Sequence, residues 1–169
     1  LGYDAKGGYL PSLATEWKYS PDNKTLTLTL RKGVKFHDGT DFNAAAAKSN
    51  LLARQAGKFG DLDNLSSVDI IDDYTIRLNL SFYTNVLLHY FTQSGNGQSS
   101  PTTVQTLGAD KMLLNPVGTG PFKFVSYEPN VRLTYNRFDG YWQSGRPYLD
   151  GIVINYIADP TTAELAFQR

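Results

Sequence analysis

The alternation of hydrophobic and polar residues is the clearest pattern in this chain. Residues 24–31 alternate so strictly that their leucines share one face of an extended strand and their threonines share the other. Residues 14–19 have the composition of a second strand, and the Ser-Pro-Asp-Asn segment at 20–23 supplies turn chemistry between them. The pattern predicts an antiparallel hairpin with one apolar face.

Two further hairpins follow the same logic. Residues 67–71 and 75–80 form the second pair, with a turn at Asp72 and Asp73. The third pair is formed by residues 121–128 and 131–136, which turn at Pro129 and Asn130. A final strand, more buried than the others, is predicted over residues 152–157.

Helices are predicted between the hairpins. Asn43 is a suitable N-cap for the alanine-rich segment 44–55, and Gly57 follows its end. Shorter helices are predicted at residues 85–91, 101–107 and 160–168. Antiparallel hairpins interleaved with short helices indicate an α+β fold with a mainly antiparallel sheet.

Composition excludes several classes of function. The 169 residues include 41% hydrophobic and 19% charged residues, which indicates a folded globular domain. Sixteen basic and sixteen acidic residues cancel, so no positive field attracts nucleic acid, and none is expected as a partner. The absence of cysteine removes disulfides and thiolate metal sites. Residues 1–6 have no features of a signal peptide, so we expect a processed form or an excised piece.

The candidate catalytic and metal-binding residues favour structural interpretations. His37 precedes Asp38 in a turn, but no Ser or Cys nucleophile motif accompanies the pair. His89 lies in an apolar helix, where a satisfied helix-face role is the simpler interpretation. The acidic segment 61–64 approaches a calcium-loop pattern, but the residues that follow do not supply the required oxygen ligand and glycine. We therefore expect no metal, no cofactor and no enzyme activity.

Two glycine-containing segments remain open to interpretation. Residues 118–120 lead into a strand rather than a helix, which indicates a tight turn and not a phosphate loop. Residues 93–100 form a polar segment that is either a plain surface loop, the favoured interpretation, or a ligand-facing one. On residue chemistry alone, a binding or structural domain is the expectation.

Two blocks of sequence resemble a known family. Residues 13–43 read LATEWKYSPDNKTLTLTLRKGVKFHDGTDFN, and residues 115–168 contain PVGTGPF, YW, RPYLD and DPTT in that order. Both blocks resemble the signature of the family-5 extracellular solute-binding proteins of bacterial ABC importers. One departure is the run of alanines at 44–47, where the family usually has acidic residues. The loss should weaken the helix start by up to about 1 kcal/mol.

The resemblance implies a function and a place in a larger fold. Family members bind oligopeptides, dipeptides, nickel chelates, opines or oligosaccharides outside the membrane and deliver them to permease subunits. Their two lobes close on the ligand about a hinge. Members are about three times this length, so residues 1–169 are expected to be a single partial domain. It would be the lobe-one subdomain of a periplasmic-binding-protein-like fold (class II, cluster C), with the second lobe absent.

The resemblance also implies where a ligand would bind. In relatives, the segment after the first helix and the loop after the short apolar helix approach the cleft; here these are residues 54–59 and 93–98. Phe59 is expected to be a stacking wall, and the other expected contacts are Arg54, Gln93, Ser94 and Asn96. The motif residues His37 and 118–120 are scaffold in this interpretation.

The expected protein is a monomer, extracellular or periplasmic, with a lipid anchor in the full-length form left open. An oligopeptide or dipeptide is the expected ligand. The alternative is a structural or protein-interaction module that binds no small molecule itself.

Overall fold

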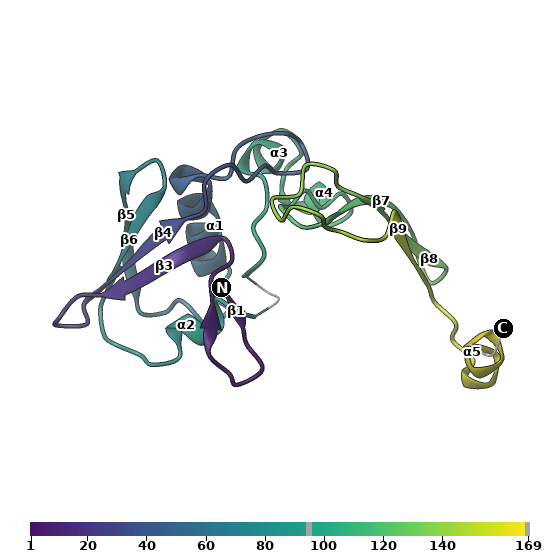
Figure 1. Cartoon of the computed structure of the whole chain (residues 1–169), viewed down its shortest axis with the longest axis horizontal. Helices are drawn as coiled ribbons and strands as arrows, with labels where there is room; N and C mark the ends of the chain where they lie inside the picture. Colours follow the sequence, from purple (N-terminus) through teal and green to yellow (C-terminus); the bar gives the residue numbers. More distant parts are fainter. Residues whose placement is uncertain (94–95, 168–169) are drawn as a thin grey trace.

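The computed structural model describes residues 1–93 and 96–167. Figure 1 shows two regions arranged along the long axis of the molecule. The first contains a four-stranded sheet with the helix α1 beside it, and the second contains a three-stranded sheet. No helix in the described ranges is long and apolar enough to cross a membrane.

The four-stranded sheet is built from the first two predicted hairpins, which are confirmed. Its strands are β3 (Ala14–Tyr19), β4 (Thr25–Leu30), β5 (Leu65–Asp72) and β6 (Thr75–Leu80). They are antiparallel and follow the order β3-β4-β6-β5. The hairpins are joined by the pairing of β4 with β6, which places Leu26 opposite Leu78. Sequence pattern alone did not predict which strands of the two hairpins would meet.

One face of this sheet forms the core together with α1 (Ala44–Ala56). Leu26 and Leu78 are both 0% exposed. Burial of each such side chain contributes about 1.5–3 kcal/mol to stability. The small alanine side chains of α1 allow the helix to approach the leucine face closely, and Ala44, Ala46 and Ala47 are buried.

The predicted N-cap of α1 is confirmed, because Asn43 Oδ1 accepts a hydrogen bond from the Ala46 amide at 3.0 Å. The helix ends one residue later than predicted, and the Gly57 amide donates to the Ala53 carbonyl. The first turn contains no acidic residue, as the sequence showed.

Short elements cover the sides of the core. The hairpin of β1 (Gly2–Tyr3) and β2 (Tyr9–Leu10) was not predicted, because two-residue strands leave no periodic pattern. The apolar segment 85–91 forms only the short helix α2 (Leu87–Tyr90). The predicted helix at residues 101–107 is confirmed as α3 (Pro101–Leu107), and α4 (Ala109–Met112) follows it.

The three-stranded sheet has the order β7-β8-β9. Its strands are β7 (Phe122–Glu128), β8 (Arg132–Arg137) and β9 (Gly151–Asn155), so the third hairpin is confirmed. The prediction that the last strand is more buried is wrong: Val153 is 56% exposed. The reason is that β9 is an edge strand of a sheet with no fully buried residue on either face.

The helix α5 (Pro160–Phe167) lies beyond the second sheet, near the C-terminus in Figure 1. It confirms the predicted helix over the residues that the structure describes. Gln168, the last residue of that prediction, lies outside the described residues.

Candidate functional site

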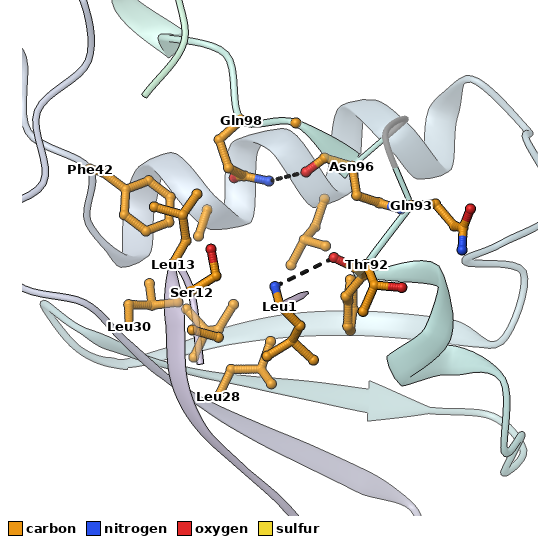
Figure 2. Close-up of a pocket in the computed structure, with 16 residues that line it drawn as sticks. Leu1, Ser12, Leu13, Leu28, Leu30, Phe42, Thr92, Gln93, Asn96 and Gln98 are labelled. Carbon is orange, nitrogen blue, oxygen red and sulfur yellow. Dashed lines mark hydrogen bonds between the residues drawn. The ribbon is translucent and has the colours of Figure 1, made fainter. Parts of the chain in front are cut away.

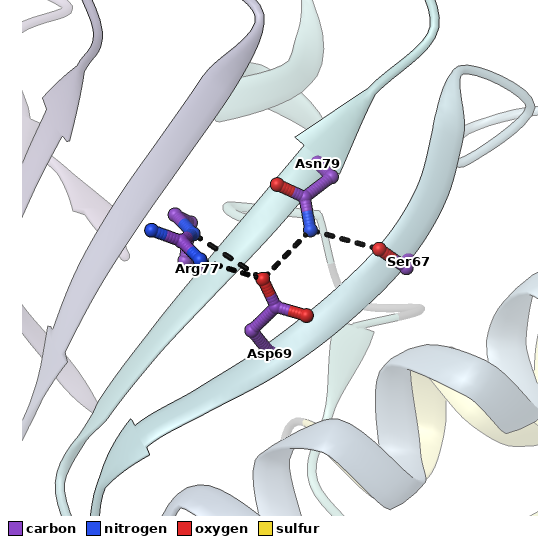
Figure 3. Close-up of polar contacts among 4 residues, drawn as sticks. All are labelled: Ser67, Asp69, Arg77 and Asn79. Atoms are coloured by element: carbon purple, nitrogen blue, oxygen red, sulfur yellow. Dashed lines mark hydrogen bonds and ion pairs between the residues drawn. The ribbon is translucent and has the colours of Figure 1, made fainter.

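A pocket of about 260 Å³ lies beside the core, between α1, the four-stranded sheet and residues 91–93 and 96–98. Its floor is apolar and includes Leu28, Leu30 and Leu51. Its rim includes the polar residues Gln93, Asn96 and Gln98. Figure 2 shows Gln98 and Asn96 on the side of the pocket opposite Leu28 and Leu30.

The polar side chains on the rim are amides, and the α-amino group of Leu1, which also lines the pocket, donates to the Phe91 carbonyl at 3.5 Å. Gln98 Nε2 donates to the Asn96 carbonyl at 3.2 Å, and Asn96 Nδ2 donates to the Tyr90 carbonyl. Gln98 Oε1 is buried and has no hydrogen-bond partner among the described residues. None of the side chains that line the pocket in the described ranges carries a charge. The side chains of the pocket therefore suit an apolar group bordered by groups that can hydrogen bond with amides.

The end of the rim is fixed to the core. Asn50 on α1 brackets the backbone of Ser99: its Nδ2 donates to the Ser99 carbonyl at 2.9 Å, and its Oδ1 accepts from the Ser99 amide at 2.8 Å. The next residue, Ser100, is 0% exposed and caps α3 by accepting a hydrogen bond from the Thr103 amide. These contacts hold Ser99 and Ser100 in position at the end of the rim.

The structure places Arg54 and Phe59 together, but not in this pocket. The Arg54 guanidinium lies 4.5 Å from the centroid of the Phe59 ring, and its Nε donates to Asp61 Oδ2 at 2.7 Å. Asp61 is buried, whereas Phe59 is 67% exposed. The arrangement holds an aromatic ring at the surface, supported by a cation that is itself anchored by a buried carboxylate.

The predicted ligand-binding residues thus fall into two groups. Gln93 and Asn96 line the pocket, and neither Arg54 nor Phe59 does. Ser94 lies outside the described residues. A ligand shared by both groups stays a prediction.

His37 occupies a structural position in a joint between the two regions. Its Nε2 lies 2.9 Å from the Gly120 carbonyl oxygen, and its Nδ1 lies 3.3 Å from the Gly118 amide nitrogen. Burial lowers the pKa of His37. Both ring nitrogens already have backbone partners, so this imidazole is not available as a catalytic base.

The neighbouring Asp38 holds the start of α3. Its Oδ2 accepts hydrogen bonds from the hydroxyls of Ser100 and Thr103, and its Oδ1 accepts from the Thr40 hydroxyl at 2.6 Å. Partial burial raises the pKa of Asp38, but these three hydroxyls outweigh that effect and lower the pKa to about 2. The carboxylate is therefore ionised at neutral pH and serves to fix the chain.

The second histidine also has partners. His89 on α2 contacts the Tyr3 hydroxyl through Nδ1 and the Gln93 side-chain amide through Nε2, the latter at 3.0 Å. Among the residues that the structure describes, no three His, Asp or Glu side chains come together in a way that would hold a metal ion.

Sequence reasoning missed two residues that shape the pocket. Gln98 lies within residues 93–98, which were expected near the cleft, but it was not predicted as a contact because nothing in the pattern separates it from its neighbours. Asn50 lies in the middle of a helix, where asparagine is unfavourable, and that placement was the available signal.

Residues 8–169 match the family model described as bacterial extracellular solute-binding proteins, family 5 Middle. A curated relative, the glutathione-binding protein GsiB of Shigella flexneri serotype 5b (strain 8401), is 34% identical over 165 residues. That alignment covers 92% of this chain and 31% of the relative. The chain therefore spans about a third of the length of this relative.

Solved structures show the same relation. NikZ from Campylobacter jejuni, in complex with Ni(L-His), matches with a TM-score of 0.88 at 22% identity, over 98% of this chain and 34% of that one. A dipeptide-binding protein from Pseudoalteromonas sp. SM9913, in complex with Met-Leu, matches with a TM-score of 0.84 at 25% identity. The match covers 99% of this chain and 39% of that protein. The first likeness establishes the fold, which is part of that of the periplasmic binding proteins.

Proposed function

Because this chain belongs to the family 5 bacterial extracellular solute-binding proteins, we propose that it forms part of the solute-binding component of an ABC importer. The family identified from the motifs in residues 13–43 and 115–168 is thereby confirmed. In the proposed role, the protein captures a small solute outside the membrane and delivers it to permease subunits. The relatives are solute-binding proteins rather than enzymes, which supports a binding function without catalysis.

The proposed solute is peptide-like, an oligopeptide or a dipeptide. The observation that carries this proposal is the pocket beside α1, which combines an apolar floor with a rim of side-chain amides. An apolar amino-acid side chain suits the floor, and the peptide groups on either side of it suit amide partners. Glutathione and Met-Leu, named for two of the similar proteins, are both peptides, whereas the nickel complex of the third is not.

The proposed contacts follow the two groups of residues. Gln93 and Asn96 would hydrogen bond with the peptide groups, together with Ser94, which lies outside the described residues. Phe59 would stack on the ligand through the ring face opposite the Arg54 guanidinium. Arg54 would support that ring and attract a ligand carboxylate.

The remaining wall of the cleft would come from a second lobe. The match to only 31% of the length of GsiB supports the proposal that residues 1–169 are a partial domain of a two-lobed receptor. We propose a monomeric receptor that is extracellular or periplasmic; a lipid anchor to the membrane belongs to the same proposal.

The test is a thermal-shift screen of the protein encoded by the whole reading frame that contains this segment. Short peptides, metal chelates and sugars are the three ligand sets. A peptide present at a hundred times its Kd should stabilise the protein by about 2.7 kcal/mol. A shift with chelates or sugars alone would overturn the peptide assignment, and no shift with any set would overturn the binding function.

One observation favours a second candidate function, a structural or protein-interaction module. The β7–β9 sheet exposes apolar side chains, among them Val125, Val153 and Ile154. This candidate gains support if the longer protein folds cooperatively, binds no solute, and loses a protein partner when Val153 is changed to a charged residue.

A further inference from the structure

His37 is one of the residues at which the two regions of the molecule meet. It lies in a turn after β4 that is closed by a hydrogen bond between Phe36 and Thr40, and residues 118–120 lead directly into β7 of the second sheet. The His37 amide donates to the Gly118 carbonyl at 2.9 Å, and the Gly118 amide donates back to His37 Nδ1 at 3.3 Å. The imidazole Nε2 lies 2.9 Å from the Gly120 carbonyl oxygen.

These contacts require one protonation state of the ring. A carbonyl oxygen can only accept, so Nε2 must carry a hydrogen and donate it to Gly120. An amide N–H can only donate, so Nδ1 must be unprotonated to accept from Gly118. A second proton, on Nδ1, would point at the Gly118 N–H and replace a hydrogen bond with a repulsive contact.

The surroundings of the ring also oppose a positive charge. His37 is half-buried and packs edge-on against the buried Phe138, with ring centroids 5.0 Å apart. The charged groups that face it are Lys123 on β7, which disfavours protonation, and Asp38, which favours it. Asp38 is already occupied by three hydroxyl donors, so it cannot turn fully toward the imidazole.

We propose that His37 is an acid-sensitive joint, in which protonation of the imidazole releases residues 118–120 and loosens the β7–β9 sheet from the first region. The sheet would stay tethered, because the Ser100 amide still donates to the Val117 carbonyl and the Arg31 guanidinium still lies 4.5 Å from the Trp142 ring centroid. The change is therefore a gain in mobility of the second sheet and not a separation of the regions.

The test is amide hydrogen exchange of the 169-residue chain at pH 7.5 and pH 5.5, corrected for intrinsic exchange rates. If the released histidine has an ordinary pKa near 6.5, acidification should increase the opening of residues 116–124 by up to about tenfold. Strands β4 and β6 should show no such increase. Equal pH dependence in both regions, or none in residues 116–124, would overturn the proposal.

Two variants assign the effect to the correct histidine. His37→Gln keeps a donor and an acceptor but does not titrate, so it should abolish the pH dependence. His89→Gln removes the other histidine and should leave the dependence intact. If His37→Gln fails to fold, nitrogen chemical shifts of the wild-type ring replace it. An Nε2–H tautomer at pH 7.5, lost on acidification together with protection of Gly118, supports the joint. An Nδ1–H tautomer or an imidazolium at pH 7.5 would refute it.

Discussion

Asn50 and Ser99 exchange two hydrogen bonds, with the Asn50 side-chain amide pairing with the Ser99 backbone as a neighbouring strand would. The pair joins the middle of α1 to the end of the pocket rim. The helix thus determines where the rim lies.

Replacement of Asn50 by alanine should therefore destabilise the chain. The change leaves the Ser99 amide and carbonyl without these partners, at a cost of about 1–3 kcal/mol in the free energy of unfolding. Urea unfolding measures this cost. Ser49→Ala, at an exposed position of the same helix, is the control and should change stability by less than about 0.5 kcal/mol. Equal effects of the two substitutions would show that the two hydrogen bonds between Asn50 and Ser99 contribute nothing to stability.

Replacing a buried leucine of the four-stranded sheet should lower stability more than replacing Asn50. Leu78 is 0% exposed and pairs with Leu26 across the junction of the two hairpins. Leu78→Ala should cost about 2–5 kcal/mol, because it removes buried surface and leaves a cavity. Ile71, at the end of β5, is 52% exposed, and Ile71→Ala should cost less than about 1 kcal/mol. Thermal unfolding of both variants measures the two losses of stability. A larger loss for Ile71→Ala than for Leu78→Ala would contradict the placement of Leu78 in the core.

Acid should weaken the contact between the turn at Asp38 and the start of α3. The pKa of Asp38 is lowered from 3.8 to about 2, so the folded state binds this proton less readily than the unfolded chain. The resulting stability is fully present above about pH 4 and is lost as the pH falls toward 2. Asp38→Asn should remove this part of the pH dependence of unfolding.

Asp41→Asn is the matched control for the acid prediction. Asp41 pairs with Lys35 at 2.7 Å, but both side chains are about half exposed, and such pairs contribute little. The two variants can be compared by urea unfolding between pH 2 and pH 6. A wild-type pH profile retained in Asp38→Asn would contradict the assignment.

Much of the fold could be predicted from local patterns. The alternation in residues 24–31 and 75–80 determines which side chains face the core, and the Asn43 cap determines where α1 begins. The pairing of β4 with β6 could not be predicted, because each leucine face is compatible with several neighbours. The exposure of Val153 was missed because the apolar composition of a strand does not show what covers it.

The candidate site was only partly predictable. The family resemblance directed attention to residues 93–98, and the structure places Gln93 and Asn96 on a pocket. Their pocket depends on Leu28 and Leu30, which were predicted only as part of the apolar face of a strand, and on Leu51, for which no role was predicted. Contacts across such separations leave no local signal. The same holds for His37, whose partners at 118 and 120 are about eighty residues away.

The most direct test of the solute-binding account is calorimetric titration of the longer protein with a dipeptide that carries an apolar side chain. The account predicts saturable binding that Gln93→Ala weakens about tenfold, equivalent to about 1.4 kcal/mol, because a rim hydrogen bond is lost. Gln105→Ala, at an exposed position on α3, should leave the affinity unchanged. Absence of binding, or a Gln93→Ala variant with wild-type affinity, would contradict the account.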